Sequence, residues 1–176
     1  MCLSIGIYYE PNLKVEAEYA CARLQETFPN IISTVIALME VPAAAFDTAT
    51  GQYDVNFLLE LLALQQHCDK VIWIVGHDIG DIWHSYLFGA ALSSRAVVSS
   101  ARLRCLESLA KEVCHETGHM QGLKHCKNLC CMRKSWTTEG VLTKSMAICE
   151  ACRDSLKGVS QEWPSVSYPA TCTSSV

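Results

Sequence analysis

One eleven-residue segment constrains this chain more than any other stretch of its sequence. Residues 115–125 read His-Glu-Thr-Gly-His-Met-Gln-Gly-Leu-Lys-His. His115 and His119 stand four positions apart, so on a helix both imidazoles project from the same face. Gly122 permits a sharp backbone turn, which allows His125 to return toward the first two histidines. The segment therefore predicts a helix that ends near Gly122 and presents three imidazoles to one metal ion.

The residue types in this segment also indicate a chemistry. Three imidazole ligands leave one coordination position open, which is typical of catalytic rather than structural zinc. Glu116 stands beside the first histidine, where its carboxylate could accept a proton from a zinc-activated water molecule. Unrelated surface histidines are the simpler alternative, but three of the six histidines fall in this window. A chain that has lost its activity can still keep such ligands, so a zinc-binding interaction module remains an alternative.

Composition limits the partners that we expect. The 176 residues suit one domain, and half of them are hydrophobic, enough for a substantial core. A net charge of −4, with 18% charged residues, gives no electrostatic reason to expect nucleic acid. The N-terminus does not resemble a signal peptide, and no apolar stretch reaches the ~20 residues that a membrane helix needs. We therefore expect an intracellular, cytoplasmic protein with no membrane partner.

The cysteines form a second pattern. Eleven cysteines are present, an odd number that rules out complete pairing into internal disulfides. Five fall in the short stretch 126–152, which contains Cys130-Cys131 and ends with Cys149-Glu-Ala-Cys152. Two close pairs of cysteines are typical of a four-thiolate zinc site, although free cysteine is also a common core residue. Because we expect reduced thiols inside the cell, we interpret the cluster as a second zinc site.

Before residue 100, apolar β-rich runs alternate with helical patterns, as in α/β proteins with a mostly parallel sheet. The run Lys70–Gly76 is apolar almost throughout, which predicts a strand covered on both faces. The other predicted strands are Leu3–Tyr9, Ile31–Met39, Tyr86–Ala91 and Arg95–Ser99. The predicted helices are Lys14–Phe28, Val55–His67, Ala101–Gln121 and a short helix through Leu156, with a loop at Pro42–Gln52.

Residues 115–152 together resemble the archaemetzincin family of metzincin zinc metallopeptidases. That family joins the long three-histidine motif to an immediately following cysteine, a second cysteine, a methionine and a distal Cys-x-x-Cys. The resemblance implies that the three histidines hold a catalytic zinc and that Glu116 is the general base. It also implies that Met132 forms the methionine turn beneath the metal.

The resemblance further implies a structural zinc bound by four cysteines, and hence two zinc ions per chain. The family usually places four residues between its first two cysteines and one residue before the methionine, but here Cys126 and Met132 are one residue closer. Cys130 preserves the step to Met132, whereas Cys131 preserves the spacing between cysteines. Because the methionine must remain beneath the zinc, we favour Cys130 and keep Cys131 as the alternative. The expected ligands are Cys126, Cys130, Cys149 and Cys152.

The resemblance covers roughly residues 50–155. It implies an α/β fold bordering on α+β: a mixed, mostly parallel twisted sheet with an antiparallel edge strand, a backing helix and an active-site helix. A small Cys-rich subdomain would follow at 123–158, after an N-terminal subdomain at 1–122 and before a loose tail at 159–176. The substrate-binding edge strand would comprise Tyr86, Leu87, Phe88, Gly89, Ala90 and Ala91.

The expected function is hydrolysis of peptide bonds in a peptide or protein substrate by zinc-activated water, without a covalent intermediate. The interaction module without useful proteolysis is the main alternative, and hydrolysis of a non-peptide amide is a third. The sequence does not indicate whether the enzyme is an endopeptidase or an aminopeptidase. It also carries no pattern that indicates the cleavage preference or the oligomeric state.

Overall fold

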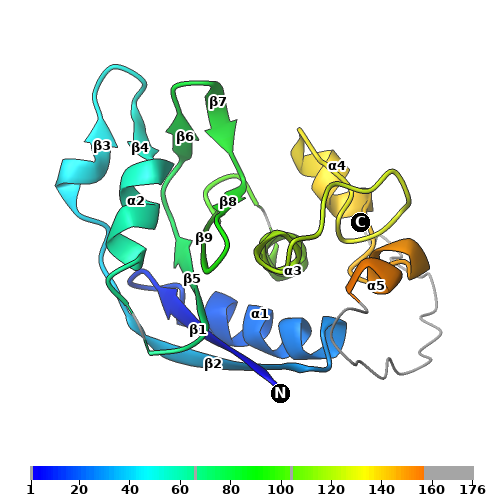
Figure 1. The fold of residues 1–176 in the computed structure, drawn as a ribbon. Coiled ribbons are helices and arrows are strands. Elements are labelled where there is room, and N and C mark those ends of the chain that lie inside the picture. The colour runs from blue at the N-terminus through cyan, green and yellow to red at the C-terminus, as the bar shows by residue number, and fades with distance from the viewer. Residues whose placement is uncertain (1, 66, 104, 157–176) are drawn as a thin grey trace.

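The computed structural model describes residues 2–65, 67–103 and 105–156 (Figure 1). Its strands are β1 (Leu3–Tyr9), β2 (Ile31–Leu38), β3 (Phe46–Asp47), β4 (Gln52–Asp54), β5 (Lys70–Val75), β6 (Ile79–Asp81), β7 (His84–Leu87), β8 (Gly89–Ala91) and β9 (Arg95–Ser99). Its helices are α1 (Lys14–Thr27), α2 (Val55–Leu62), α3 (Leu106–Met120), α4 (Thr138–Thr143) and α5 (Glu150–Leu156), with a short 3-10 helix at Ala43–Ala45. None of the helices in these ranges has the length and apolar character needed to cross a bilayer.

The larger sheet has the strand order β2-β1-β5-β9-β8. Its first four strands pair in parallel, and β8 pairs antiparallel with β9 at the edge. The predicted mixed sheet with an antiparallel edge strand is therefore confirmed. Parallel strands need long crossover connections: α1 lies in the one between β1 and β2, α2 in the one between β2 and β5, and β6 to β8 in the one between β5 and β9.

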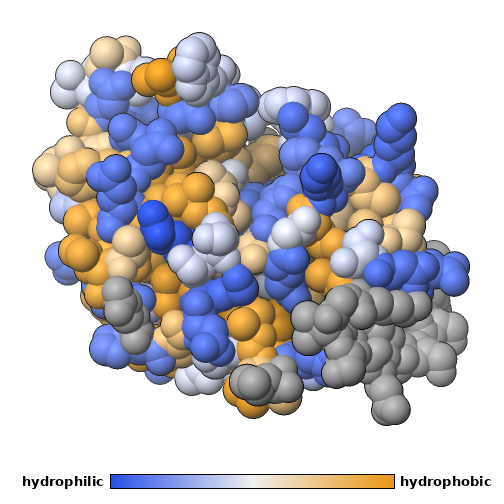
Figure 2. Space-filling model, in the orientation of Figure 1, coloured by the Kyte–Doolittle hydropathy of each residue, from blue (hydrophilic) through white to orange (hydrophobic). Residues whose placement is uncertain are grey.

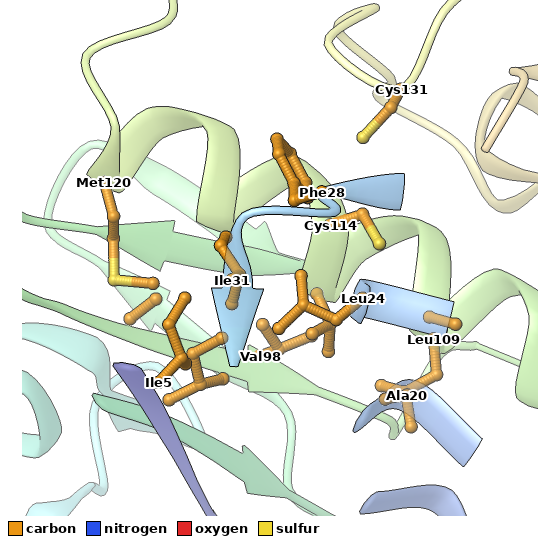
Figure 3. Packing of buried hydrophobic residues seen from close by; sticks show 14 of the residues in the cluster. Ile5, Ala20, Leu24, Phe28, Ile31, Val98, Leu109, Cys114, Met120 and Cys131 are labelled. Atoms are coloured by element: carbon orange, nitrogen blue, oxygen red, sulfur yellow. The ribbon is translucent and has the colours of Figure 1, made fainter. Parts of the chain in front are cut away.

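Successive residues of the central strands face opposite sides of this sheet. Ile72 and Ile74 of β5 belong to the core cluster beneath α1 and α3, which Figure 3 shows from close by. Val71, Trp73 and Val75 belong to the cluster on the α2 side. Each such buried side chain contributes roughly 1.5–3 kcal/mol relative to an exposed one, so both helix layers are held by the sheet. The strand β5 is therefore covered on both faces, as its apolar run predicted.

A second, four-stranded sheet was not indicated by the sequence. Its order is β3-β4-β6-β7. The predicted loop Pro42–Gln52 is partly wrong, because it contains the 3-10 helix and β3, and because Gln52 begins β4. The single predicted strand Tyr86–Ala91 is also wrong: it divides at Phe88 into β7, which pairs with β6, and β8, which pairs with β9. Phe88 is buried, so the strand changes sheets at a core anchor.

Two predicted helices are shorter than expected. Cys105, the residue before α3, has extended backbone with φ −148°, so the helix begins at Leu106 instead of Ala101. The helix predicted to reach His67 ends at Leu62. Figure 1 shows α3 between the sheet on one side and α4 and α5 on the other. The predicted tail at 159–176 lies outside the described residues, and the predicted subdivision at residue 122 stays a prediction.

Candidate metal sites and substrate cleft

The end of α3 brings the three predicted histidines together. After Gln121, Gly122 adopts φ +87°, a left-handed conformation that glycine accepts without steric cost. The N–H of Leu123 bonds the carbonyl of Gly118, and the N–H of Gly122 bonds that of His119. This glycine-capped turn reverses the chain, so that His125 lies against the two helical histidines.

The histidine cluster fits a zinc ion. Nε2 of His119 lies 3.1 Å from Nε2 of His115 and 3.3 Å from Nε2 of His125. A tetrahedral zinc with bonds of ~2.0–2.1 Å places its nitrogens ~3.3 Å apart. Nδ1 of His115 donates to the carbonyl of Cys131 at 2.8 Å, and Nδ1 of His119 donates to that of Leu123 at 2.8 Å. These bonds leave the Nε2 lone pairs pointing at a common centre, as in most zinc sites.

Burial favours the neutral form of the three histidines. It lowers the pKa of His115 to about 2, with the charge of Lys144 acting in the same direction. It also lowers the pKa of His119 and of His125. The imidazoles are therefore neutral at pH 7, which is the form that binds metal.

Glu116 lies on the same helix and faces the cleft. Burial raises its pKa to about 8, and the nearby Glu112 carboxylate adds to the shift. β8 approaches it closely at Gly89: a Cβ atom there would lie 2.9 Å from Oε1 of Glu116, closer than real Cβ atoms come. Sequence patterns placed Gly89 in the edge strand but did not indicate that Glu116 requires a glycine at this position.

Met132 packs against the same helix. It is fully buried, and a Cβ atom on Gly118 would lie only 2.2 Å from its sulfur. The carbonyl of Met132 accepts a hydrogen bond from the N–H of Cys126 at 2.9 Å. The turn that contains Met132 thus joins the end of the histidine motif to the cysteine cluster.

Four cysteines form the second cluster. The sulfurs of Cys126 and Cys149 are 3.7 Å apart, and those of Cys130 and Cys152 are 3.8 Å apart. Tetrahedral zinc with Zn–S bonds of ~2.3 Å separates its sulfurs by ~3.8 Å, so the donor set fits zinc. The structure places Cys130, and not Cys131, in this cluster. The Cys131 sulfur instead lies 3.9 Å from the carbonyl of Lys111 in the core.

A cleft of about 640 Å³ runs past the histidines and Glu116. One wall is β8, and the opposite wall is the segment Lys134–Trp136, which precedes α4. In the orientation of Figure 1, the space-filling view is hollowed between these sides (Figure 2). The Tyr86 hydroxyl donates to the carbonyl of Trp136, and the His84 ring stacks on Trp136 with centroids 6.4 Å apart. Sequence patterns did not indicate the cleft roles of His84 or of Lys134–Trp136.

An ion pair behind the cleft supports Tyr86. Nε of Arg102 donates to Asp78 at 2.7 Å and Nη2 donates to its second oxygen at 2.5 Å, while the guanidinium lies 4.1 Å from the centre of the Tyr86 ring. The hydrogen bonds from Arg102 hold the pKa of Asp78 below its ordinary value, against the opposing effect of burial. Asp78 therefore acts through Arg102 on Tyr86 at the cleft wall.

This ion pair gives a prediction for stability. Asp78→Asn should lower the free energy of unfolding by about 1 kcal/mol at pH 7, since a partly exposed pair contributes modestly. Because folding lowers the pKa of Asp78, the difference from the parent should stay constant down to about pH 4 and shrink below the ordinary value of 3.8. Urea unfolding at pH 7, 5 and 3.5 measures this. Glu60→Gln, which removes an exposed charge from α2, should show no such pattern.

Comparisons with known proteins identify the family. A model of Peptidase family M54 matches residues 90–158. The archaemetzincin of Nanoarchaeum equitans is 36% identical over 115 residues, which cover 65% of this chain and 68% of the relative. That of Archaeoglobus fulgidus is 29% identical over 162 residues, which cover 86% and 98%.

Two solved archaemetzincins share the fold. The structure from Methanopyrus kandleri has a TM-score of 0.80 at 26% identity and covers 89% of this chain and 94% of its own. The Archaeoglobus fulgidus structure, a complex with malonate, has a TM-score of 0.78 at 28% identity and covers 86% and 99%. The fold, the metal-binding side chains and these matches define a zinc-dependent metallopeptidase. The chain belongs to the archaemetzincin family.

Proposed function

We propose that the chain hydrolyses peptide bonds with one zinc ion held by His115, His119 and His125 and with Glu116 as the general base. The observation that carries this proposal is the position of the histidine cluster. Its three Nε2 atoms converge on the floor of a cleft, beside a buried carboxylate and along a sheet edge. The cleft that contains these groups offers an extended peptide both a place to bind and a reactive centre.

The edge strand β8 supplies backbone groups for such a peptide. Toward β9, Phe88 accepts a hydrogen bond from the N–H of Ser99, and Leu92 donates one to the carbonyl of Arg95. Because backbone groups alternate in direction along an antiparallel strand, those of Gly89 and Ala91 point away from β9. We expect the main chain of the substrate to pair with these two residues, which places its scissile bond above Glu116.

Glu116 would transfer the proton in this reaction. When bound, zinc supplies a Lewis acid that activates water and polarises the peptide carbonyl. The Glu116 carboxylate takes the proton of the attacking water and carries it to the departing amine. Burial raises the pKa of Glu116, which makes the carboxylate a stronger base, and a zinc cation bound beside it would favour the ionised form that accepts the proton.

The cysteine cluster completes the proposal with a second, structural zinc held by Cys126, Cys130, Cys149 and Cys152. With four protein ligands the site is closed, as structural sites are. Because all four ligands lie between residues 126 and 152, it would hold the two ends of the Cys-rich subdomain together and keep Met132 beneath the histidines. Four thiolates require a reducing environment, which supports an intracellular location.

Two proline variants of β8 test whether the main chain of the substrate pairs with this strand. Ala91→Pro removes an N–H that faces the cleft, so kcat/KM for peptides should fall about three- to tenfold while the fold stays intact. The matched variant Ala90→Pro removes an N–H that faces β9, and it should lower the unfolding temperature. If Ala91→Pro cleaved peptides at the parent rate, the substrate would not pair with β8.

A further inference from the structure

One buried ion pair beside the cleft has no role in the mechanism above. Lys144, at the end of α4, has no exposed side-chain surface, and its Nζ lies 2.5 Å from Oε1 of Glu112. Glu112 is on α3, four residues before Glu116, and is itself 4% exposed. Lysine is almost never fully buried unless it is paired, so the ammonium is held in place by this carboxylate.

Glu112 also contributes to the cleft wall. It lines the same cavity as His115 and Glu116. Nζ of Lys144 and Oε1 of Glu112 form the ion pair, and neither atom has a further hydrogen-bond partner among the described residues. Glu112 thus places a carboxylate that is paired with Lys144 on the lining of the cleft, one helical turn (~5.4 Å) from Glu116.

A purely structural role does not account for this arrangement. Removing water from two charges costs more than it returns unless further bonds are formed, and apolar side chains of similar volume often serve at least as well. The pair does join α3 to the segment that leads to Cys149. That function needs no carboxylate on the wall of a substrate cleft.

We infer that Glu112 is a specificity-determining residue that accepts a hydrogen bond from a lysine or arginine side chain of the substrate, and that Lys144 is its positioning residue. This inference rests on the proposed peptidase function. The aliphatic stem of a basic side chain would pass Phe88 and the small residues of β8, and its charged end would reach Glu112. An acidic side chain would meet both Glu112 and Glu116, so its entry is disfavoured.

Cleavage of a peptide library, with products identified by mass spectrometry, tests this preference. The reduced, zinc-loaded parent should favour Lys or Arg over Ala by tenfold or more at one fixed position from the scissile bond, and Glu should be rejected there. Glu112→Gln should abolish the preference. Because that change leaves Lys144 buried without its anion, the double variant Glu112→Leu with Lys144→Met serves as a second, charge-free test. Glu139→Gln, which removes an exposed carboxylate from α4, should keep the preference.

A binding series separates this inference from the peptidase function itself. Peptide hydroxamates that carry Lys, Ala or Glu next to the zinc-binding group are not cleaved, and their affinities are measured by calorimetry. The parent should bind the Lys compound tenfold more tightly than the Ala compound, and Glu112→Gln should bind both equally. If no peptide of the library were cleaved but the hydroxamate affinities were as predicted, the peptidase function would be wrong and the role of Glu112 would stand. An unchanged Lys preference in both Glu112 variants, or no preference in the parent, would overturn the role of Glu112.

Discussion

Glu116→Gln should lower the rate of peptide hydrolysis by at least ~10²-fold while zinc remains bound. Glutamine keeps the size and shape of the side chain beside Gly89 but cannot accept the proton of the attacking water. Since His115, His119 and His125 are unchanged, metal content and unfolding temperature should match those of the parent. Steady-state cleavage of a peptide substrate, with zinc measured by elemental analysis in the same sample, gives both quantities.

The matched variant for this experiment is His119→Ala. His119 is central to the cluster, with its Nε2 within 3.3 Å of both other histidines. Its loss should remove the zinc of this site together with the activity, because two imidazoles hold zinc weakly. The two variants therefore separate proton transfer from metal binding. Near-parent activity in zinc-loaded Glu116→Gln would show that another group is the base.

Cys149→Ser should reduce the zinc content from two ions per chain to one and lower the free energy of unfolding by about 3 kcal/mol or more. Thiolate zinc sites contribute ~10–16 kcal/mol in small zinc-binding peptides, and loss of one ligand removes a fraction of this. For a chain of this size the unfolding temperature should fall by roughly 6–12 °C.

Cys2→Ser is the control for this variant, since Cys2 is exposed and lies outside the cluster. It should keep both zinc ions and the parent unfolding temperature. Two zinc ions and parent stability in Cys149→Ser would contradict the structural zinc site. A mild chelator should remove the histidine-bound ion first, because a three-ligand site is open to solvent and a four-thiolate site is closed.

The sequence predicted those regions of the fold that have a local signal. β1, β5 and α1 are continuous apolar or periodic runs, and their observed bounds differ from the predicted ones by at most one residue. The histidine segment carries its own geometry, since the spacing of four residues and the glycine turn both act locally. The strands β3, β4 and β6 have two or three residues each, too few for a periodic pattern to stand out.

The surroundings of the site depend on contacts between distant segments, and these leave no local signal. Lys144 stands between Thr143 and Ser145 and looks like a solvent-exposed lysine, yet folding buries it against Glu112, 32 positions earlier in the chain. Gly89 reads as an ordinary strand glycine until α3 places Glu116 over it. The choice between Cys130 and Cys131 followed from the step to Met132, and the structure places Cys130 among the other three thiols.

The central claim, zinc-dependent peptide hydrolysis, is tested most directly by digesting a broad peptide library with the reduced, zinc-loaded protein. Mass spectrometry of the new termini also distinguishes internal cleavage from removal of N-terminal residues. We predict that cleavage stops when a chelator removes the histidine-bound zinc, returns when zinc is added back, and is at least ~10²-fold slower in Glu116→Gln. A protein that carries zinc at both sites and leaves every peptide in the library intact would contradict the account and favour a zinc-binding interaction module.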